Sequence, residues 1–366
     1  MALTFRLQQT IKMTLFTDTM AIIVLVNVAG QTHNGPFSRH MAREPRMGGE
    51  HLGRYVAKRL LFSLLVLWLI SLVVFAAVRA IPGDVCKIVL ATPDVDQKQC
   101  NAIRAELGLN RPLAVQYVSY MGNLLKGDLG NTLINKRDVA TEIRERVPLT
   151  LELTVLSTVF ALAISIPIGV ISAARQNSAW DYGLRFLSIG WLSIPSFWLG
   201  TMLIIWPARL WNYSPPAGYV DIWIDPFKNL EQLYLPAIAL GIALSASLAR
   251  VTRSSMLEVL RQDYIRTARA KGLAEGWVVV RHGLRNAMIP VTTLFALQVG
   301  VLFGGTVVLE SIFALPGLGQ LTFNAVTIKD YTEVQGLVLF FATVLVAINL
   351  MVDLSYAWID PRIRYA

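Results

Sequence analysis

The chain has 366 residues, of which 54% are hydrophobic and only 16% are charged, whereas a soluble domain carries roughly 25% charged residues. This composition excludes a disordered chain, and it is more apolar than a soluble core requires. The formal net charge is +9. On a membrane protein such an excess reflects the Lys and Arg bias of cytoplasmic loops, so we expect no nucleic-acid partner.

Residues 1–53 are predicted to form an N-terminal extension. The apolar run at 20–30 follows two basic residues, as the hydrophobic region of a signal peptide does, but it is too short to span a bilayer. The alternative is that this stretch is not part of the working protein and that translation begins at Met41 or Met47. A dispensable tail or an interfacial segment is a third alternative.

Six charge-free apolar windows follow, at residues 60–78, 153–174, 186–208, 232–249, 286–309 and 334–352. A bilayer needs about 20 residues of apolar helix, which is the length of these windows. Lipid-exposed backbone must be a helix or a closed barrel, and barrel strands would be shorter and alternating. The chain is therefore predicted to be an all-α integral membrane protein with six transmembrane helices.

Basic residues in the short loops predict the orientation of these helices. They concentrate before the first window and in alternate loops, above all in residues 250–285, so both termini are predicted to be cytoplasmic. The first helix would occupy residues 54–80, and residues 81–150 an extracytoplasmic region. Residues 151–366 would form the core domain, with five transmembrane helices and the cytoplasmic loop 250–285.

The extracytoplasmic region holds both cysteines of the chain, Cys86 and Cys100, which are 14 residues apart. Disulfides are permitted outside the cytoplasmic membrane. The sequence leaves two alternatives open, a disulfide or two free thiols.

Small residues recur every fourth position in two windows. They are Ala237, Gly241 and Ser245 in the fourth window, and Gly300 and Gly304 in the fifth. Such rows let helix backbones approach closely, within the subunit, at a dimer contact or along a pore. In the third window Pro195 predicts a kink of the kind that suits a moving gate.

Motifs for chemistry are absent from the sequence. It has no phosphate-binding loop, zinc-protease motif or nucleophile elbow, so we expect no catalytic residue, metal site or cofactor in this chain. The six windows hold no Asp, Glu, Lys or Arg, which argues against an ion-coupled secondary carrier and against an intramembrane enzyme. Another chain is expected to supply the energy.

The loop 250–285 holds eight basic and three acidic residues. Two apolar series have helical spacing, namely Leu257, Leu260, Tyr264 and Ala268, and Trp277, Val280, Leu284 and Met288. Gly272 separates them, as a residue just past a helix end does. The pattern predicts a helix, a sharp turn and a second helix that present basic residues to a partner's groove. The alternative is a plain solvated loop.

The sequence Asp-Tyr-Ile-Arg-Thr-Ala-Arg-Ala-Lys-Gly-Leu at 263–273, followed by Arg-His-Gly-Leu-Arg-Asn-Ala-Met-Ile-Pro at 281–290, closely resembles the conserved loop of ATP-binding cassette (ABC) importer permeases. It is most similar to the dipeptide and oligopeptide (peptide/nickel) family, first-subunit type. Stretches at 81–84, 107–113, 127–130, 310–319 and 360–365 resemble the same family. The likeness covers residues 54–366. Arg-Thr-Ala at 266–268 replaces the importer-wide Glu-Ala-Ala, as is usual in the peptide branch.

The resemblance implies a type I ABC importer fold in the cytoplasmic (inner) membrane. The loop would be a coupling helix that docks on a separate ATPase subunit. The residues implied are Asp263, Tyr264, Arg266, Thr267, Ala268, Arg269, Ala270, Lys271, Gly272 and Leu273. Implied partners are two ATPase subunits that bind ATP and Mg, a homologous second permease, an extracytoplasmic substrate-binding protein and membrane lipid. The implied cargo is di- or oligopeptides, with glutathione, nickel chelates or oligosaccharides as alternatives.

Overall fold

The computed structural model describes residues 50–80, 86, 97–106 and 108–359, and of these it describes the backbone alone for 50–55, 97, 106, 301, 304, 305 and 352–359. The N-terminal extension before residue 50 and the motifs at 81–84 and 360–365 lie outside the described residues, as does residue 107.

The described chain is helical, and its only β-type pairing is an isolated bridge between Asn131 and Asp138. The all-α prediction is therefore confirmed for this part of the chain. The helices are α2 (Glu50–Ala80), α4 (Gln97–Glu106), α5 (Leu113–Leu124), α6 (Val139–Ala174), α7 (Ala179–Ser193), α8 (Ser196–Trp211), α9 (Pro226–Leu260), α10 (Asp263–Ala270), α11 (Glu275–Trp277), the π-helix η1 (Val278–Leu284), α12 (Arg285–Gly305), α13 (Val307–Ile312), α14 (Leu318–Ile328) and α15 (Tyr331–Ile359).

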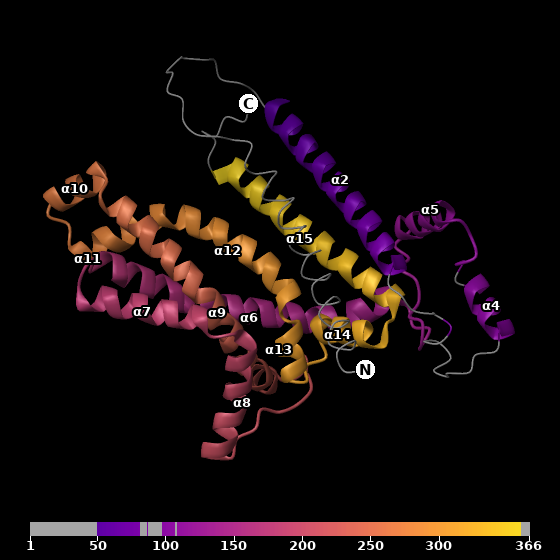
Figure 1. Cartoon of the computed structure of the whole chain (residues 1–366). Coiled ribbons are helices and arrows are strands. Elements are labelled where there is room, and N and C mark those ends of the chain that lie inside the picture. Colours follow the sequence, from indigo (N-terminus) through magenta and orange to yellow (C-terminus); the bar gives the residue numbers. More distant parts are fainter. Residues whose placement is uncertain (1–49, 81–85, 87–96, 107, 360–366) are drawn as a thin grey trace.

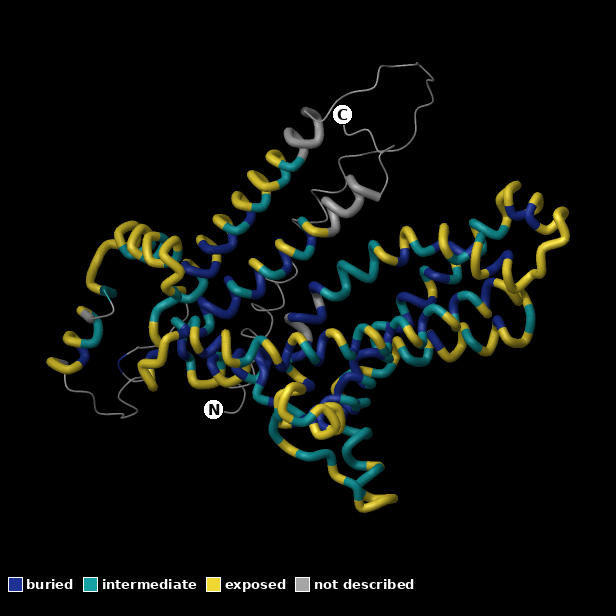
Figure 2. The backbone as a smooth tube through the Cα atoms, turned by 180° about the vertical axis from the view of Figure 1, so that it is seen from behind, coloured by how far each residue is buried: buried dark blue, intermediate teal, exposed yellow. Residues whose placement is uncertain are grey.

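The centre of the fold is the long parallel pair α6 and α9, with α12 packed beside it (Figure 1). Leu153 of α6 and Leu233 of α9 are fully buried in its core. A second pair, α2 and α15, runs side by side and packs through Val66, Ile70 and Ala342. In Figure 2 the buried residues follow α6 and α9, whereas α2, α7 and α8 show long exposed stretches.

Four helices are long and apolar enough to cross a membrane, at Val56–Ala80, Val139–Ala174, Pro226–Leu260 and Tyr331–Met351. The bent pair α7 and α8 makes five if it counts as one span. Exposed apolar side chains on these helices, such as Leu61 and Leu64 of α2, suit contact with lipid. These counts concern the described residues, and the six-helix topology stays a prediction.

The third window differs from the single kinked helix that the sequence predicted. It is split between α7 and α8, which are bent by 96°. Ile194 is extended (φ −91°, ψ 118°) and Pro195 precedes the first turn of α8. Proline disfavours helical geometry in the residue before it and offers no N–H, so the helix ends instead of bending gently.

The α6 helix begins well before its apolar window, at Val139. The carboxylate of Asp138 accepts a hydrogen bond from the N–H of Thr141 at 2.9 Å and caps the helix. Glu142 forms ion pairs with Arg137 at 2.7 Å and Arg146 at 2.9 Å. Because Glu142 is paired with nearby arginines, the polar N-terminal turns of α6 remain helical although they lie outside the apolar window.

Candidate functional site

The loop between the fourth and fifth windows forms a short helix, α10, which protrudes at one end of the bundle (Figure 1). The α9 helix ends at Leu260, and the extended residue Gln262 (φ −71°, ψ 150°) immediately precedes α10. After α10 the chain reverses at Gly272, whose φ of +79° lies in the left-handed region that a side chain disfavours. The helix thus sits between two sharp turns.

A small apolar core attaches α10 to the bundle. Ile265 is fully buried and packs with Ala268 of α10, Val278 of η1 and Leu260 at the end of α9. Burial of a side chain of this size stabilises its position by roughly 2 kcal/mol. Ile265 therefore ties α10 to the end of α9 and to the start of η1.

The continuous apolar face predicted through Leu260, Tyr264 and Ala268 is wrong. The helix breaks after Leu260, which changes the phase, so that Ile265 is buried and Tyr264 is 43% exposed. The Tyr264 hydroxyl instead accepts a hydrogen bond from Asn286 Nδ2 at 2.8 Å, an additional link between α10 and α12.

The second predicted face is wrong for a similar reason. The segment Val278–Leu284 is a π-helix, whose wider turn shifts the phase of its side chains. Val278 and Val279 are buried, whereas Trp277 and Val280 are 56% and 59% exposed.

Arg269 closes the turn around Gly272. Its Nε and Nη2 donate hydrogen bonds to the two carboxylate oxygens of Glu275, at 3.0 and 2.6 Å. These hydrogen bonds lower the pKa of Glu275 and raise that of Arg269. Part of the predicted basic face is therefore already paired within the loop.

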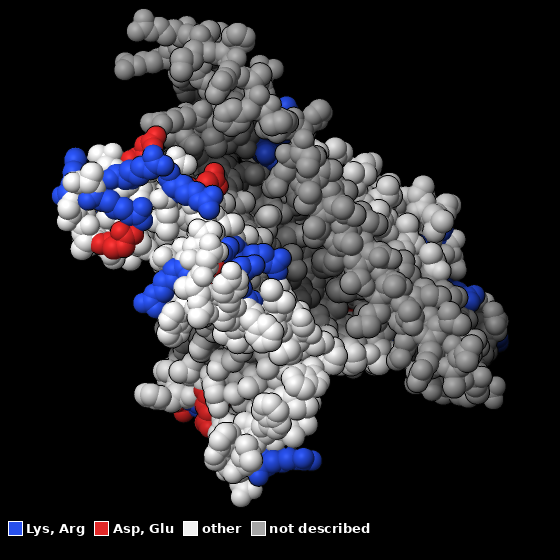
Figure 3. All heavy atoms as spheres, turned by 60° about the vertical axis from the view of Figure 1, so that its left-hand side comes forward, with Lys and Arg blue, Asp and Glu red and all other residues white. Residues whose placement is uncertain are grey.

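The remaining loop residues face outward, and the space-filling view shows basic side chains gathered at this end of the molecule (Figure 3). The Arg266 side chain is 77% exposed, and its Nη1 lies 3.5 Å from the carboxylate of Asp263, whose side chain is 96% exposed. The exposed members of the predicted set are Asp263, Tyr264, Arg266, Thr267, Arg269, Ala270, Lys271, Gly272 and Leu273, and Ala268 is buried.

The row of small residues in α9 lies against α6. Ala237 and Ser245 are fully buried. A Cβ on Gly241 would lie 2.8 Å from Phe160 Cβ and 2.9 Å from the carbonyl oxygen of Ser157. In the second row, a Cβ on Gly300 would lie 2.6 Å from Leu345 Cδ1 of α15. Gly304 lies within α12, but its surroundings are outside the described residues.

Cys86 and Cys100 are joined as a disulfide, with their Cα atoms 5.2 Å apart. Both are buried. Of the two alternatives that the sequence left open, the structure therefore contains the disulfide.

Sequence reasoning missed a buried ion pair near the α10 end of the bundle. Arg253 of α9 donates hydrogen bonds to both carboxylate oxygens of Asp181 in α7, and to the hydroxyl of Ser172 in α6. Asp181 is fully buried. The capping pattern Ser-Ala-Trp-Asp at 178–181 marks the start of α7, but no local signal points to the arginine 72 residues away.

A second buried carboxylate was also missed. Glu310 is fully buried and accepts hydrogen bonds from the hydroxyls of Thr150 and Thr306, at 3.0 and 2.7 Å, and from the N–H of Gln320 at 3.0 Å. It thereby joins α6, α13 and the first turn of α14. The glycines of the 310–319 motif make room for it, since a Cβ on Gly317 would collide with the carboxylate.

Two family profiles match this chain. The profile "Binding-protein-dependent transport system inner membrane component" matches residues 165–365. The profile "Binding-prot-dependent transport system membrane comp, N-term" matches residues 52–154. Together they cover the α10 loop and both long helix pairs, apart from residues 50–51 of α2 and 155–164 of α6.

Curated relatives match over almost their whole length. The chain is 41% identical over 312 residues to the glutathione transport system permease protein GsiC of Escherichia coli O6:H1 (strain CFT073), covering 85% of this chain and 99% of that protein. It is 41% identical over 317 residues to the oligopeptide transport system permease protein AppB of Bacillus subtilis (strain 168), covering 86% and 100%.

Among solved structures, a chain of the MetNI methionine ABC transporter in an inward-facing conformation gives a TM-score of 0.48 at 20% identity, over 60% of this chain and 96% of that one. The profile and relatives, together with the several apolar spans, identify the chain. It belongs to the family of inner membrane components of binding-protein-dependent transport systems, as the multi-pass permease subunit of an ABC importer.

Proposed function

We propose that this permease imports peptides, either di- and oligopeptides or the tripeptide glutathione. The support is the cargo named for the two relatives, each 41% identical over nearly its full length. Nickel chelates and oligosaccharides are the alternative cargoes within the same importer class. An extracytoplasmic binding protein would deliver the cargo, and a homologous second permease would complete the pathway across the membrane.

In the proposed topology six helices cross the membrane and both termini are cytoplasmic, so that α10 lies in the cytoplasm. The chain itself would be non-catalytic. Two partner ATPase subunits would bind ATP and Mg, and α10 would dock in a groove of one of them. The observation that carries this assignment is an exposed basic helix between two sharp turns, attached by buried Ile265 to the bundle.

The packing offers a route from α10 to the membrane helices. A push on α10 acts on the end of α9 through the contact of Ile265 with Leu260. Further along α9, Thr252 and the carbonyl of Ala249 lie so close to Gly169 that α6 and α9 have no room for a side chain between them. Helices packed this closely move together, so closure of the ATPase pair would tilt α6 with α9.

The test is ATP-dependent uptake of labelled peptides by proteoliposomes that hold the whole complex and its binding protein. Arg266→Glu is the sharpest variant, because that side chain is 77% exposed and makes only a weak contact of 3.5 Å. We expect it to lower uptake and peptide-stimulated ATP hydrolysis at least about tenfold, since a misplaced interface charge costs several kcal/mol. The complex should still assemble.

The matched control is the charge swap Arg269→Glu with Glu275→Arg, which exchanges a pair already closed within the loop. It should retain more uptake than Arg266→Glu. Unchanged uptake in Arg266→Glu would mean that α10 is a solvated segment that does not dock on the ATPase. Uptake driven by an ion gradient without the ATPases would overturn the coupling mechanism. ATP hydrolysis without peptide movement would point to one of the alternative cargoes.

A further inference from the structure

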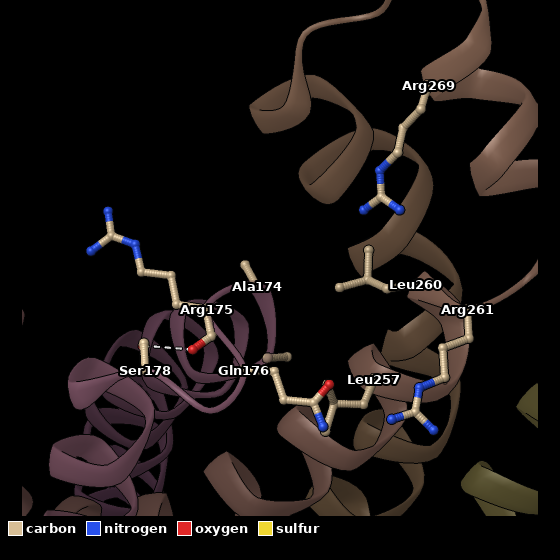
Figure 4. A pocket seen from close by; sticks show the side chains of 9 residues that line it. Ala174, Arg175, Gln176, Ser178, Leu257, Leu260, Arg261 and Arg269 are labelled. Atoms are coloured by element: carbon tan, nitrogen blue, oxygen red, sulfur yellow. Dashed lines mark hydrogen bonds between the residues drawn. The ribbon is translucent and has the colours of Figure 1, made fainter.

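A cavity of about 460 Å³ opens where α6, α9 and α10 meet (Figure 4). Its apolar wall is made of Ala173, Ala174, Leu257 and Leu260, and its polar wall of Arg175, Gln176, Ser178, Arg261 and Arg269. The close-up shows Arg269 reaching down from α10 toward Leu260, with Gln176 and Leu257 on the opposite side. Three separate segments of the chain therefore contribute to one site.

The lining carries three guanidinium groups and no carboxylate. Arg269 is paired with Glu275, but Arg175 and Arg261 form no ion pair within the part of the chain that is described. The α6 and α9 helices end here, and their two C-termini are together equivalent to roughly one negative charge. The three guanidinium groups carry three positive charges. The helix C-termini and Glu275 together offset about two of them, so the cavity keeps roughly one positive charge. Nearby Asp181 adds nothing, since Arg253 already neutralises it.

One wall of the cavity lies where the apolar part of α6 ends, at Ala174. The other wall, with Leu257, Leu260 and Arg261, lies beyond the charge-free part of α9, in the basic segment 250–285. The indole ring of Trp180 is 62% exposed and lies 5.7 Å from the Arg175 guanidinium. Tryptophan side chains of this kind mark the headgroup level of a bilayer.

We propose that this cavity binds the phosphate headgroup of an anionic phospholipid. Guanidinium groups match phosphate oxygens in charge and in hydrogen-bond geometry. The apolar wall makes no favourable contact with inorganic phosphate, but the glycerol and first methylenes of a lipid would pack against it. Basic pockets between membrane helices are sites of this type.

The placement of Arg269 gives the lipid a second effect. A headgroup held by Arg261 at the end of α9 and by Arg269 on α10 joins the exposed helix to the bundle, and Arg175 adds positive charge beside it. The lipid thus stiffens the link between α10 and α9. This inference goes beyond the proposed import of peptides, and binding is measured without any transport.

The experiment is native mass spectrometry of the full chain in detergent, titrated with dioleoyl phosphatidylglycerol or dioleoyl phosphatidylcholine. We expect one phosphatidylglycerol to be retained more tightly than the others, with phosphatidylcholine binding at least about tenfold more weakly. The double variant Arg175→Gln/Arg261→Gln should weaken that binding about thirty-fold, because each basic residue near an anionic lipid contributes roughly a factor of five. The matched control is Arg185→Gln, an exposed arginine of α7 that does not line the cavity.

Equal binding of the two lipids by the wild-type chain would overturn the proposal whether or not the double variant folds, as would equal binding by the double variant and its control. Displacement of phosphatidylglycerol by millimolar inorganic phosphate would assign the site to free phosphate and overturn the lipid. Complete loss of the lipid on adding the ATPase subunits would show that the assembled importer does not hold a lipid here, and would overturn the proposal. Retention under both conditions supports the lipid site.

Discussion

Arg253 of α9 and Asp181 of α7 form a two-pronged hydrogen-bonded ion pair, with both donor–acceptor distances at 2.8 Å. The carboxylate is fully buried, and the arginine side chain is 21% exposed. The hydroxyl of Ser172 in α6 bonds to both partners. One ion pair thereby fastens three helices beside the proposed lipid cavity.

Removing one partner should be costly. Asp181→Asn is expected to lower the free energy of unfolding by about 3 kcal/mol, because it leaves a largely buried guanidinium without its counter-charge. The measurement is thermal unfolding of the full chain in detergent. The double variant Asp181→Leu/Arg253→Met, which removes both charges, should be more stable than Asp181→Asn. If the double variant is less stable than Asp181→Asn, this account is wrong. The ion pair would then stabilise the fold by more than the neutralisation of a buried charge.

Gly241 sets how closely α9 approaches α6. Gly241→Ala should destabilise the protein by about 1–3 kcal/mol, since its Cβ would meet Phe160 Cβ at 2.8 Å and the backbone of Ser157 at 2.9 Å. Gly190→Ala in α7 is the matched control, because a Cβ there meets nothing within 4 Å. The control should be neutral or gain up to about 1 kcal/mol of helix propensity. Equal unfolding temperatures for the two variants would contradict this account.

Features that depend on local sequence were the predictable ones. Long apolar windows predict helices because lipid leaves the backbone few other choices, and they appear as α2, α6, α9, α12 and α15. A tight turn was expected at Gly272, which has φ +79°. The break at Pro195 was anticipated only as a kink, since the sequence does not show that the next helix turns through 96°.

Features that depend on distant contacts were not predictable. Asp181 and Arg253 lie outside the charge-free windows, and nothing in the local sequence predicts that they pair. The phase of α10 was also missed, because Tyr264 and Ile265 are both apolar enough to be buried. Only the break after Leu260 and the wide turns of η1 decide that Ile265 is the buried one.

Thr150 is the central link of the Glu310 cluster. Its hydroxyl donates to Glu310 Oε1 at 3.0 Å and accepts from the N–H of Leu318 at 2.9 Å. Thr150→Val should cost about 1–3 kcal/mol in unfolding free energy, because it leaves a buried N–H without an acceptor. Thr154→Val is the matched control, since that hydroxyl bonds only the carbonyl of Thr150 in its own helix. The control should cost clearly less, and equal losses would contradict the linking role.

The pairing of Glu275 with Arg269 makes the turn at Gly272 sensitive to acid. The hydrogen bonds from Arg269 lower the pKa of Glu275 below its usual range near 4.5. The stabilisation is therefore present above the pKa of the unfolded chain and is lost as the pH falls through the lower pKa of the folded one. We expect proteolysis after Lys271 by an acid-tolerant protease to speed up below about pH 4. Glu275→Gln should be cleaved quickly at neutral pH and show no such rise. If the protease cleaves Glu275→Gln only slowly after Lys271 at neutral pH, this account is wrong. The turn would then stay closed through Gly272 alone, without the Arg269–Glu275 pair.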